Sequence, residues 1–422
     1  MTQKVIKRNG EKVQFNEDKI RSAIERAFLE VHPNDWKSSF VKTFANAITK
    51  NVVQSIEEHD EISVEDIQDV VEHWLMRSDD LETAKAYIKY RYEHELARQV
   101  QKDKAIEEKL MAEKIDNQNA NVDEHSFGGR IGEASSVVMR DFALEHCMSK
   151  MARDNHLNNE IYIHDLDHYA VGDHNCLSIP FDKLLAKGFN TRQADVRSAN
   201  SLNTAFQLVA VIFQLQSLQQ FGGVSATHLD WTMVPYVRKS FCKHYCDGLQ
   251  YIENKPEQIG NYKNPSGEKI EDISIEDSWY KIFPKAYKYA MDMTIKECHQ
   301  AVEGMYHNLN TLQSRSGNQL PFTSINYGTC TLPEGRMVIK EILEVSIEGV
   351  GALHKTSIFP CGIFQCMKGI NRMPEDPNYD LFRLALRSTA QRLYPNYVNV
   401  DWSVNAGYDK DDPKTYTSTM GL

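Results

Sequence analysis

Apolar and polar positions at the start of the chain alternate first with the period of a strand and then with that of a helix. Two short strands are predicted at residues 5–7 and 12–15, and between them stands Asn9-Gly10, the dipeptide that best tolerates the positive φ angles of a tight hairpin turn. Asn16 occupies the position of a helix N-cap. The apolar residues that follow recur at helical spacing: Ile20, Ala23, Ile24, Ala27 and Phe28. The pattern predicts a β-hairpin followed directly by an amphipathic helix.

Three more helices are predicted within the first hundred residues. The first lies within residues 35–57, the second starts at a capping-box-like Ser63-Val64-Glu65-Asp66, and the third covers residues 84–91. Apolar stripes mark the first two of these helices: Phe40, Phe44, Ile48 and Val52, then Ile67, Val70, Val71, Trp74 and Leu75. Residues 97–118 mix charges with sparse apolar positions, so we expect a helical connector to a second, larger domain.

From residue 119 onward, helical and strand-like patterns alternate, which predicts a helix-rich α/β core. Helices are expected at residues 134–152, 202–220 and 279–312, and strands at residues 321–326, 357–365 and 397–402. The helix at residues 202–220 has an apolar surface too wide for a half-exposed helix. It is therefore either buried in the core or placed at a subunit interface.

Composition indicates a globular protein of two or three domains, with 422 residues, 41% of them hydrophobic and 25% charged. The longest apolar run, residues 202–218, is interrupted by three glutamines, and no apolar signal segment opens the chain, so no membrane span is expected. A net charge of −11 disfavours a nucleic-acid partner. Eight scattered cysteines are typical of free thiols, so we expect a cytoplasmic protein.

A local basic cluster stands out against this acidic balance. The predicted hairpin brings Lys7, Arg8, Lys12 and Lys19 to one small region beside a helix start. Fixed cations and free backbone N–H groups together are how proteins hold a phosphate chain. The alternative reading of these residues alone is a solvated hairpin without a ligand.

The hairpin, the capped helices and the segment Ala84-Lys85-Ala86-Tyr87-Ile88-Lys89-Tyr90-Arg91 resemble the ATP-cone, the nucleotide-sensing module at the N-terminus of many ribonucleotide reductases. The resemblance covers residues 1–97 and implies ATP and dATP as allosteric effectors, sensed through a change of oligomer. It implies these effector contacts: Lys7, Arg8, Gly10, Phe15, Asn16, Lys19, Ile20, Tyr87 and Arg91.

The larger region resembles a second family along most of its length. The stretches that carry the resemblance, in order, are residues 161–167 with Asn175-Cys176, 219–224, 310–323, 358–360, 376–380 and 394–403. They are similar to the catalytic subunit of the anaerobic, class III ribonucleotide reductase, a glycyl-radical enzyme. The resemblance implies that residues 119–422 form an incomplete ten-stranded α/β barrel. It also implies a ribonucleoside triphosphate substrate, a homodimer or higher oligomer, a radical-SAM activase and no metal in this chain.

Such an enzyme must remove the 2′-hydroxyl of a ribose, which ordinary acid–base groups do not achieve at an unactivated carbon. A thiyl radical abstracts the 3′-hydrogen instead, and that chemistry needs a dry, shaped site. The resemblance gives Cys176 the role of the thiyl-radical cysteine, with His164 and Asn175 in the substrate pocket. We therefore expect the Cys176 thiol to face an enclosed, sugar-sized chamber. The alternatives are a buried structural cysteine and a buried, hydrogen-bonded pair of His164 with Asp165.

Cys242 and Cys246 flank His244 on a helix-like segment and superficially suggest a metal site. Two residues are about 200° of helix, so His244 should point away from the face that the two cysteines share. We expect a buried or half-buried pair of thiols and no metal here.

The chain ends Met420-Gly421-Leu422, where the family that it resembles has a second active-site cysteine after Met-Gly. In that family several hundred residues follow, including the radical glycine. We therefore expect the glycyl radical on a missing C-terminal part, a possible complementing polypeptide and no turnover by this chain alone. A split gene, an artificially shortened piece and an interrupted coding region would each explain the end.

The function that these patterns favour is anaerobic reduction of ribonucleoside triphosphates to deoxyribonucleoside triphosphates under ATP and dATP control. Two other classes stay open. One is a nucleotide-binding regulatory protein, such as the repressors that carry an ATP-cone behind a zinc ribbon, although only three residues precede the cone here. The other is a non-catalytic relic or interaction fragment that keeps the fold without the reaction.

Overall fold

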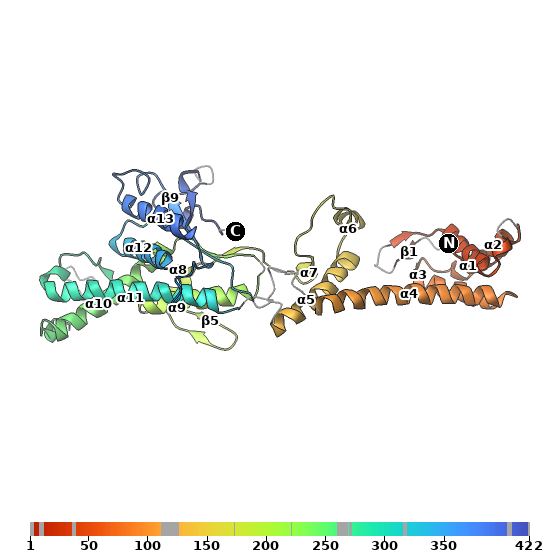
Figure 1. The fold of residues 1–422 in the computed structure, drawn as a ribbon, viewed down its shortest axis with the longest axis horizontal. Helices are drawn as coiled ribbons and strands as arrows, with labels where there is room; N and C mark the ends of the chain where they lie inside the picture. Colours follow the sequence, from red (N-terminus) through yellow and green to blue (C-terminus); the bar gives the residue numbers. More distant parts are fainter. Residues whose placement is uncertain are drawn as a thin grey trace. The chain divides into compact units, whose positions relative to one another are not determined.

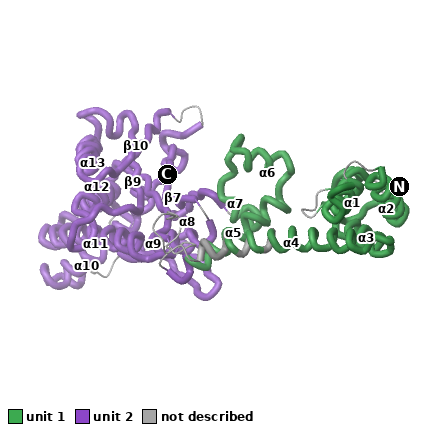
Figure 2. The backbone as a smooth tube through the Cα atoms, turned by 45° about the vertical axis from the view of Figure 1, so that its right-hand side comes forward, with its two compact units in different colours: residues 1–119, 130–172 green, residues 120–129, 173–422 purple. Residues whose placement is uncertain are grey.

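The computed structural model describes residues 4–7, 12–35, 39–110, 126–172, 174–220, 222–259, 269, 272–314, 319–402 and 407–420. The chain divides into two compact units, one of residues 1–119 with 130–172 and one of residues 120–129 with 173–422 (Figure 2). Each unit has its own cluster of buried apolar side chains.

The first unit opens with the predicted hairpin. Strands β1 (Lys4–Ile6) and β2 (Lys12–Gln14) pair antiparallel, and the Asn9-Gly10 turn between them lies outside the described residues. A third strand, β3 (Glu61–Ser63), pairs parallel with β1. The helices of this part are α1 (Glu17–Val31), α2 (Ser39–Ile56), α3 (Val64–Met76) and α4 (Leu81–Leu110), and both α1 and α3 pack on α4 (Figure 1).

Two helix starts in this unit form as their sequences predict. The Asn16 side chain accepts a hydrogen bond from the backbone N–H of Asp18 at 2.8 Å, and the Ser63 hydroxyl accepts from the N–H of Asp66 at 3.1 Å. Each cap satisfies a backbone donor that a helix start leaves without an intrahelical partner. Helix α4 joins the predicted helix at residues 84–91 to the predicted connector as far as residue 110, and residues 111–118 lie outside the described part.

The remaining described elements of the first unit are α5 (Phe127–Phe142), whose first three residues belong to the second unit, a π-helical turn (Ala143–Cys147), α6 (Lys150–Leu157) and α7 (Leu166–Tyr169). The single helix predicted at residues 134–152 is wrong in its boundaries, because the chain leaves helical geometry at Met148 with φ −110° and ψ 150°. Ser149 then accepts a hydrogen bond from the N–H of Ala152 at 3.2 Å and starts α6. Serine favours such caps over helix interiors, which explains the break.

The second unit is built on a five-stranded, all-parallel sheet in the order β10-β9-β8-β7-β4. Its strands are β4 (Leu177–Ser178), β7 (Val224–Ala226), β8 (Thr323–Tyr327), β9 (Cys361–Cys366) and β10 (Asn396–Asn399). The helices are α8 (Phe181–Lys187), α9 (Leu202–Ser217), α10 (Leu229–Tyr251), α11 (Pro284–Thr311), α12 (Pro333–Glu348) and α13 (Tyr379–Arg392). Strands β5 (Phe189–Asn190) and β6 (Asp195–Val196) form a separate hairpin.

The predicted fold class, helix-rich α/β behind a small helical module with a hairpin, is confirmed. Parallel strands need long crossover connections, and helices α9 to α13 supply them. In the described residues the sheet is open, with β4 and β10 as its edges. None of the helices in the described ranges has both the length and the apolar composition needed to cross a membrane.

Helix α9 belongs to the core of the second unit. Phe206, Val209 and Phe213 are fully buried within this single chain, and α9 packs against α11. Of the two predicted places for this helix, the structure therefore shows the buried core.

A buried carboxylate connects helix α10 to the loop after β8. Asp230, at the start of α10, accepts hydrogen bonds from the backbone N–H groups of Gly328, Thr329 and Cys330 at 2.9, 3.1 and 2.9 Å. Complete burial raises the pKa of Asp230 even though these hydrogen bonds oppose the rise.

Replacing Phe206 by Ala should lower the free energy of unfolding by about 3–5 kcal/mol, because the change removes a fully buried ring and leaves a cavity. The control is Leu215→Ala on the same helix, where the side chain is 40% exposed and the loss should stay below about 1 kcal/mol. Urea unfolding of the full chain, followed by circular dichroism, measures both. Equal losses would contradict the buried position of Phe206.

Candidate functional site

A cavity of about 170 Å³ lies in the first unit, between the hairpin and helices α1, α3 and α4. Six of the nine residues predicted as effector contacts line it: Lys7, Phe15, Asn16, Lys19, Ile20 and Tyr87. Arg8 and Gly10 lie outside the described residues. Arg91 is not part of the lining.

Apolar and cationic side chains line the cavity together. Val5, Ile20, Val71 and Tyr87 are buried and contribute the apolar walls. A wider and more open hollow of about 620 Å³ shares the two lysines of the lining with it. Small-molecule clefts usually span about 300–1,000 Å³, a range that includes the wider hollow but not the smaller cavity.

Sequence reasoning missed the other side chains that line this cavity: Val5, Val13, Gln14, Ala23, Val64, Ile67, Gln68 and Val71. Most belong to the neighbouring strand β2 and to helix α3. Their signal in the sequence was only the apolar periodicity of α3, which predicts a buried face but does not say that part of that face borders a cavity.

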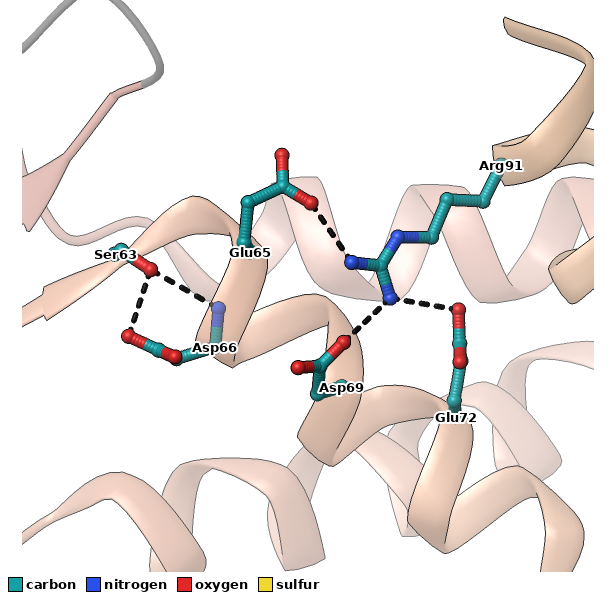
Figure 3. Close-up of polar contacts among 6 residues, drawn as sticks. All are labelled: Ser63, Glu65, Asp66, Asp69, Glu72 and Arg91. Atoms are coloured by element: carbon teal, nitrogen blue, oxygen red, sulfur yellow. Dashed lines mark hydrogen bonds and ion pairs between the residues drawn. The ribbon is translucent and has the colours of Figure 1, made fainter. Parts of the chain in front are cut away.

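Arg91, on α4, does not face the cavity lining but forms ion pairs with three carboxylates of α3 (Figure 3). Its guanidinium donates to Glu65 and Asp69 at 2.7 Å each and to Glu72 at 2.8 Å. Partial burial lowers the pKa of Arg91, but the hydrogen bonds to the three carboxylates outweigh that effect and raise the pKa overall. The acidic residues stand at positions i, i+4 and i+7 of one helix, a spacing that places them on one face and could have predicted a cationic partner.

In the second unit, Cys176 directly precedes β4. The backbone N–H of Gly223, which precedes β7, donates to the Cys176 sulfur at 3.3 Å. The two segments approach so closely that a Cβ on Gly222 would lie 1.9 Å from the carbonyl oxygen of Asn175, so only glycine fits there. Asn175 also contacts Cys176, with 3.9 Å between its Oδ1 and the sulfur.

The Cys176 thiol is exposed in this chain. The structure thus rejects the buried structural cysteine, and the described residues do not form the enclosed chamber that the sequence led us to expect. The physical reason is its place beside β4, which is two residues long and is an edge strand of the described sheet. An edge strand leaves one side uncovered.

His164 and Asp165 contact each other, but they are not the buried pair of the alternative reading, since the His164 side chain is 68% exposed. Asp165 has a left-handed φ of 54° at the start of α7. His164 belongs to the first unit, whereas Asn175 and Cys176 belong to the second. A substrate pocket that includes His164 therefore stays a prediction.

A short segment near the C-terminus covers polar side chains of the parallel sheet. We call residues 417–420 the strap. Asn326 of β8 donates to the carbonyl of Thr419 at 3.0 Å and accepts from the N–H of Thr419 at 3.0 Å. Ser225 of β7 donates to the same carbonyl at 3.2 Å. Side chains of the sheet thus replace the partners that a neighbouring strand would give the strap.

The strap runs antiparallel to the strands. Gln365, near the end of β9, donates to the carbonyl of Thr417 at 2.9 Å, whereas Ser324, near the start of β8, donates to the carbonyl of Met420. The strap therefore proceeds toward the end of the sheet at which the strands begin. Cys176 lies at that end, one residue before β4.

All eight cysteines lie in the described ranges with free thiols. His244 pairs with Glu297 at 2.7 Å between Nε2 and Oε2, while Cys242 is buried and Cys246 is half-buried. In the part of the chain that the structure describes, no three His, Cys, Asp or Glu side chains converge as a metal site requires.

The first unit thus contains a helical module with a cationic, partly apolar cavity. The second unit contains a parallel sheet with an exposed cysteine at a strand start. The family profile for anaerobic ribonucleoside-triphosphate reductase matches residues 118–421, and that for the ATP cone domain matches residues 3–96. The chain therefore belongs to the anaerobic ribonucleoside-triphosphate reductase family and carries an ATP-cone.

Individual relatives agree with this assignment. The anaerobic ribonucleoside-triphosphate reductase of Escherichia coli is 28% identical over 428 residues, which cover 100% of this chain and 55% of that protein. The enzyme of the same description from Haemophilus influenzae is 29% identical and matches 99% of this chain and 55% of its own length. The chain thus spans about half the length of the curated relatives that it matches.

Among solved structures, the anaerobic ribonucleotide reductase from Thermotoga maritima in complex with dATP and CTP matches with a TM-score of 0.43. It is 14% identical, and the match covers 65% of this chain and 43% of that one.

The rate of alkylation by iodoacetamide should differ among the cysteines according to how exposed their thiols are. Cys176 and Cys147 are exposed and should react first at pH 8. Burial raises the pKa of Cys366 to about 11, so only about a thousandth of that thiol is thiolate at pH 8. The Cys366 rate should rise about tenfold per pH unit between pH 8 and 10. Mass spectrometry of peptides measures the rates, and a slow Cys176 would contradict its exposed position.

Proposed function

We propose that this chain is the N-terminal part of an enzyme that reduces ribonucleoside triphosphates, and that its ATP-cone binds ATP or dATP as effectors. The observation that carries the effector proposal is the cavity in the first unit, whose lining includes six of the predicted contact residues. The family assignment supports the reductase part.

The chemistry of the cavity favours a nucleoside triphosphate over other ligands. Tyr87, Ile20 and Val71 offer an apolar slot for a base, and Lys7 and Lys19 supply positive charge at the same cavity. Helix α1 starts at Glu17, directly after Asn16, and both Asn16 and Lys19 line the cavity. Arg8 and Gly10, which lie between β1 and β2 in the sequence and outside the described residues, are proposed as further phosphate contacts.

For the catalytic part, we propose that Cys176 is an active-site thiol and that His164 and Asn175 belong to the substrate pocket. The position of Cys176 at the start of the parallel sheet and the direction of the strap support this proposal. The remaining length of the relatives would cover the open edge beside β4 and complete the chamber.

The radical that this reaction requires would come from that remaining part, where we propose the glycyl radical, generated by a radical-SAM activase. The chain's own residues would bind the substrate, exclude water and position the thiol. ATP and dATP would favour different oligomers, which requires that each effector bind one assembly more tightly than the other. We propose a cytoplasmic protein.

Replacing Lys7 and Lys19 together by Ala should weaken ATP binding by at least about tenfold, since each charge-assisted hydrogen bond contributes about 1.5–3 kcal/mol. The matched control removes two exposed lysines of α2, Lys42→Ala with Lys50→Ala, and should leave the affinity unchanged. Isothermal titration of the full chain with ATP measures both. Equal affinities of the two double variants would defeat the effector assignment.

Catalysis is tested by supplying the rest of the enzyme. The chain is mixed, without oxygen, with a polypeptide that provides the remaining part of a relative and with its activase. We expect a glycyl-radical EPR doublet and deoxynucleotide product. Cys176→Ser should lose the product and keep the radical, whereas Cys147→Ser, which alters the other exposed thiol, should keep both.

The competing function is that of a non-catalytic nucleotide-binding fragment. It would be favoured if the chain bound ATP while the mixture gave neither radical nor product. Product formation by the Cys176→Ser variant would instead remove Cys176 from the active site while leaving the reductase function intact.

A further inference from the structure

The cluster around Arg91 joins the two helices that close the effector cavity. Arg91 is on α4, and its three carboxylate partners, Glu65, Asp69 and Glu72, are all on α3 (Figure 3). Helix α3 also contributes Val64, Ile67, Gln68 and Val71 to the cavity lining, and α4 contributes Tyr87. The same pair of helices therefore carries both the ion-pair cluster and a wall of the cavity.

Tyr87 and Arg91 are four residues apart on α4, so their side chains lie on one face of the helix, one turn from each other. Tyr87 is 7% exposed and packs in the apolar core of the module. Any change in the distance between α3 and α4 at Arg91 would shift Tyr87 relative to Ile67 and Val71. The geometry of the cavity wall thus depends on the contact at Arg91.

The strength of this contact differs among the three partners. The side chains of Arg91 and Glu72 are 18% and 20% exposed, whereas those of Glu65 and Asp69 are 44% and 67% exposed. Exposed ion pairs contribute little, because water and salt screen them. The Arg91–Glu72 pair is therefore the part of the cluster that holds α4 on α3 most firmly.

Electrostatics argue against a direct phosphate contact by Arg91. Three carboxylates surround one guanidinium at 2.7–2.8 Å, so the cluster carries an excess of negative charge. An arriving triphosphate would be repelled by that charge and would have to displace partners already in place. Lys7 and Lys19 line the cavity and are better placed for the phosphates.

We propose that Arg91 is a positioning residue of the effector site: by pairing with Glu72, it holds α4 against α3 and keeps Tyr87 in the cavity wall. This role rests on the proposed binding of ATP by the cone. It assigns Arg91 and Glu72 to base recognition, through Tyr87, and leaves the phosphates to the lysines.

The test compares ligands that share the base and differ in phosphate. ATP and AMP are titrated into the full chain and into the variants Arg91→Met, Glu72→Gln and the control Lys85→Met, a lysine of α4 that pairs with Glu82 on the same helix. Arg91→Met and Glu72→Gln should each weaken ATP and AMP by the same factor, about five- to tenfold, which is the low end of coupling between sites. Lys85→Met should change neither affinity.

A double-mutant cycle with Tyr87→Ala separates positioning from a general loss of structure. If Arg91 acts through Tyr87, Arg91→Met should have no further effect on affinity in the Tyr87→Ala background, whereas independent effects would add. Additive effects, or a Glu72→Gln variant that binds as tightly as the unaltered chain, would overturn the positioning role.

Two other results have distinct meanings. If Arg91→Met weakens ATP but not AMP, Arg91 contacts the phosphates directly, and the positioning role is wrong while the effector function stands. If the unaltered chain binds neither nucleotide, the effector function is wrong, and the positioning role falls with it.

Discussion

The second unit depends on how its parallel sheet satisfies a buried row of polar side chains. Ser225, Ser324, Asn326 and Gln365 are fully or almost fully buried. A buried donor or acceptor left without a partner costs about 1–3 kcal/mol. The backbone of the strap accepts a hydrogen bond from each of the four side chains, and in the described residues the Oε1 atom of Gln365 stays without a partner. These bonds explain why an irregular segment without strand pairing holds a fixed course beside the sheet. The direction of that course relates the C-terminal segment to Cys176.

The first unit solves a different problem, that of keeping a cavity open inside a small core. Its buried side chains come from four helices and short strands, and a tighter approach of α3 and α4 would fill the space beside Tyr87. Half-buried ion pairs fix the separation of two helices more precisely than apolar contacts, because their geometry is directional. The cavity and the charged cluster are thus two results of one helix–helix contact.

Local signals made much of this structure predictable. The hairpin, the caps at Asn16 and Ser63 and the buried helix α9 all follow from sequence patterns within a few residues. Strands β4 and β7 were missed because they are two or three residues long and, unlike the equally short β1 and β2, do not flank a turn dipeptide such as Asn9-Gly10. The partners of Arg91 lie 19 to 26 residues away, so its place in an ion-pair cluster depends on tertiary packing that no local pattern encodes. Resemblance to a family supplied residues for the cavity, but not their neighbours on α3.

Helix α4 has a mechanical consequence. It runs from Leu81 to Leu110 as one helix of 30 residues, which at about 1.5 Å per residue makes a rod about 45 Å long. Tyr87 stands near its start, so roughly 35 Å of rod extends beyond the cavity. A tilt of about 5° at the cavity would displace the far end by about 3 Å, on the order of the shifts that repack interfaces. Because α4 is long, a tilt at the cavity that is too small to disturb the core would become a displacement of several ångströms at the other end of the helix.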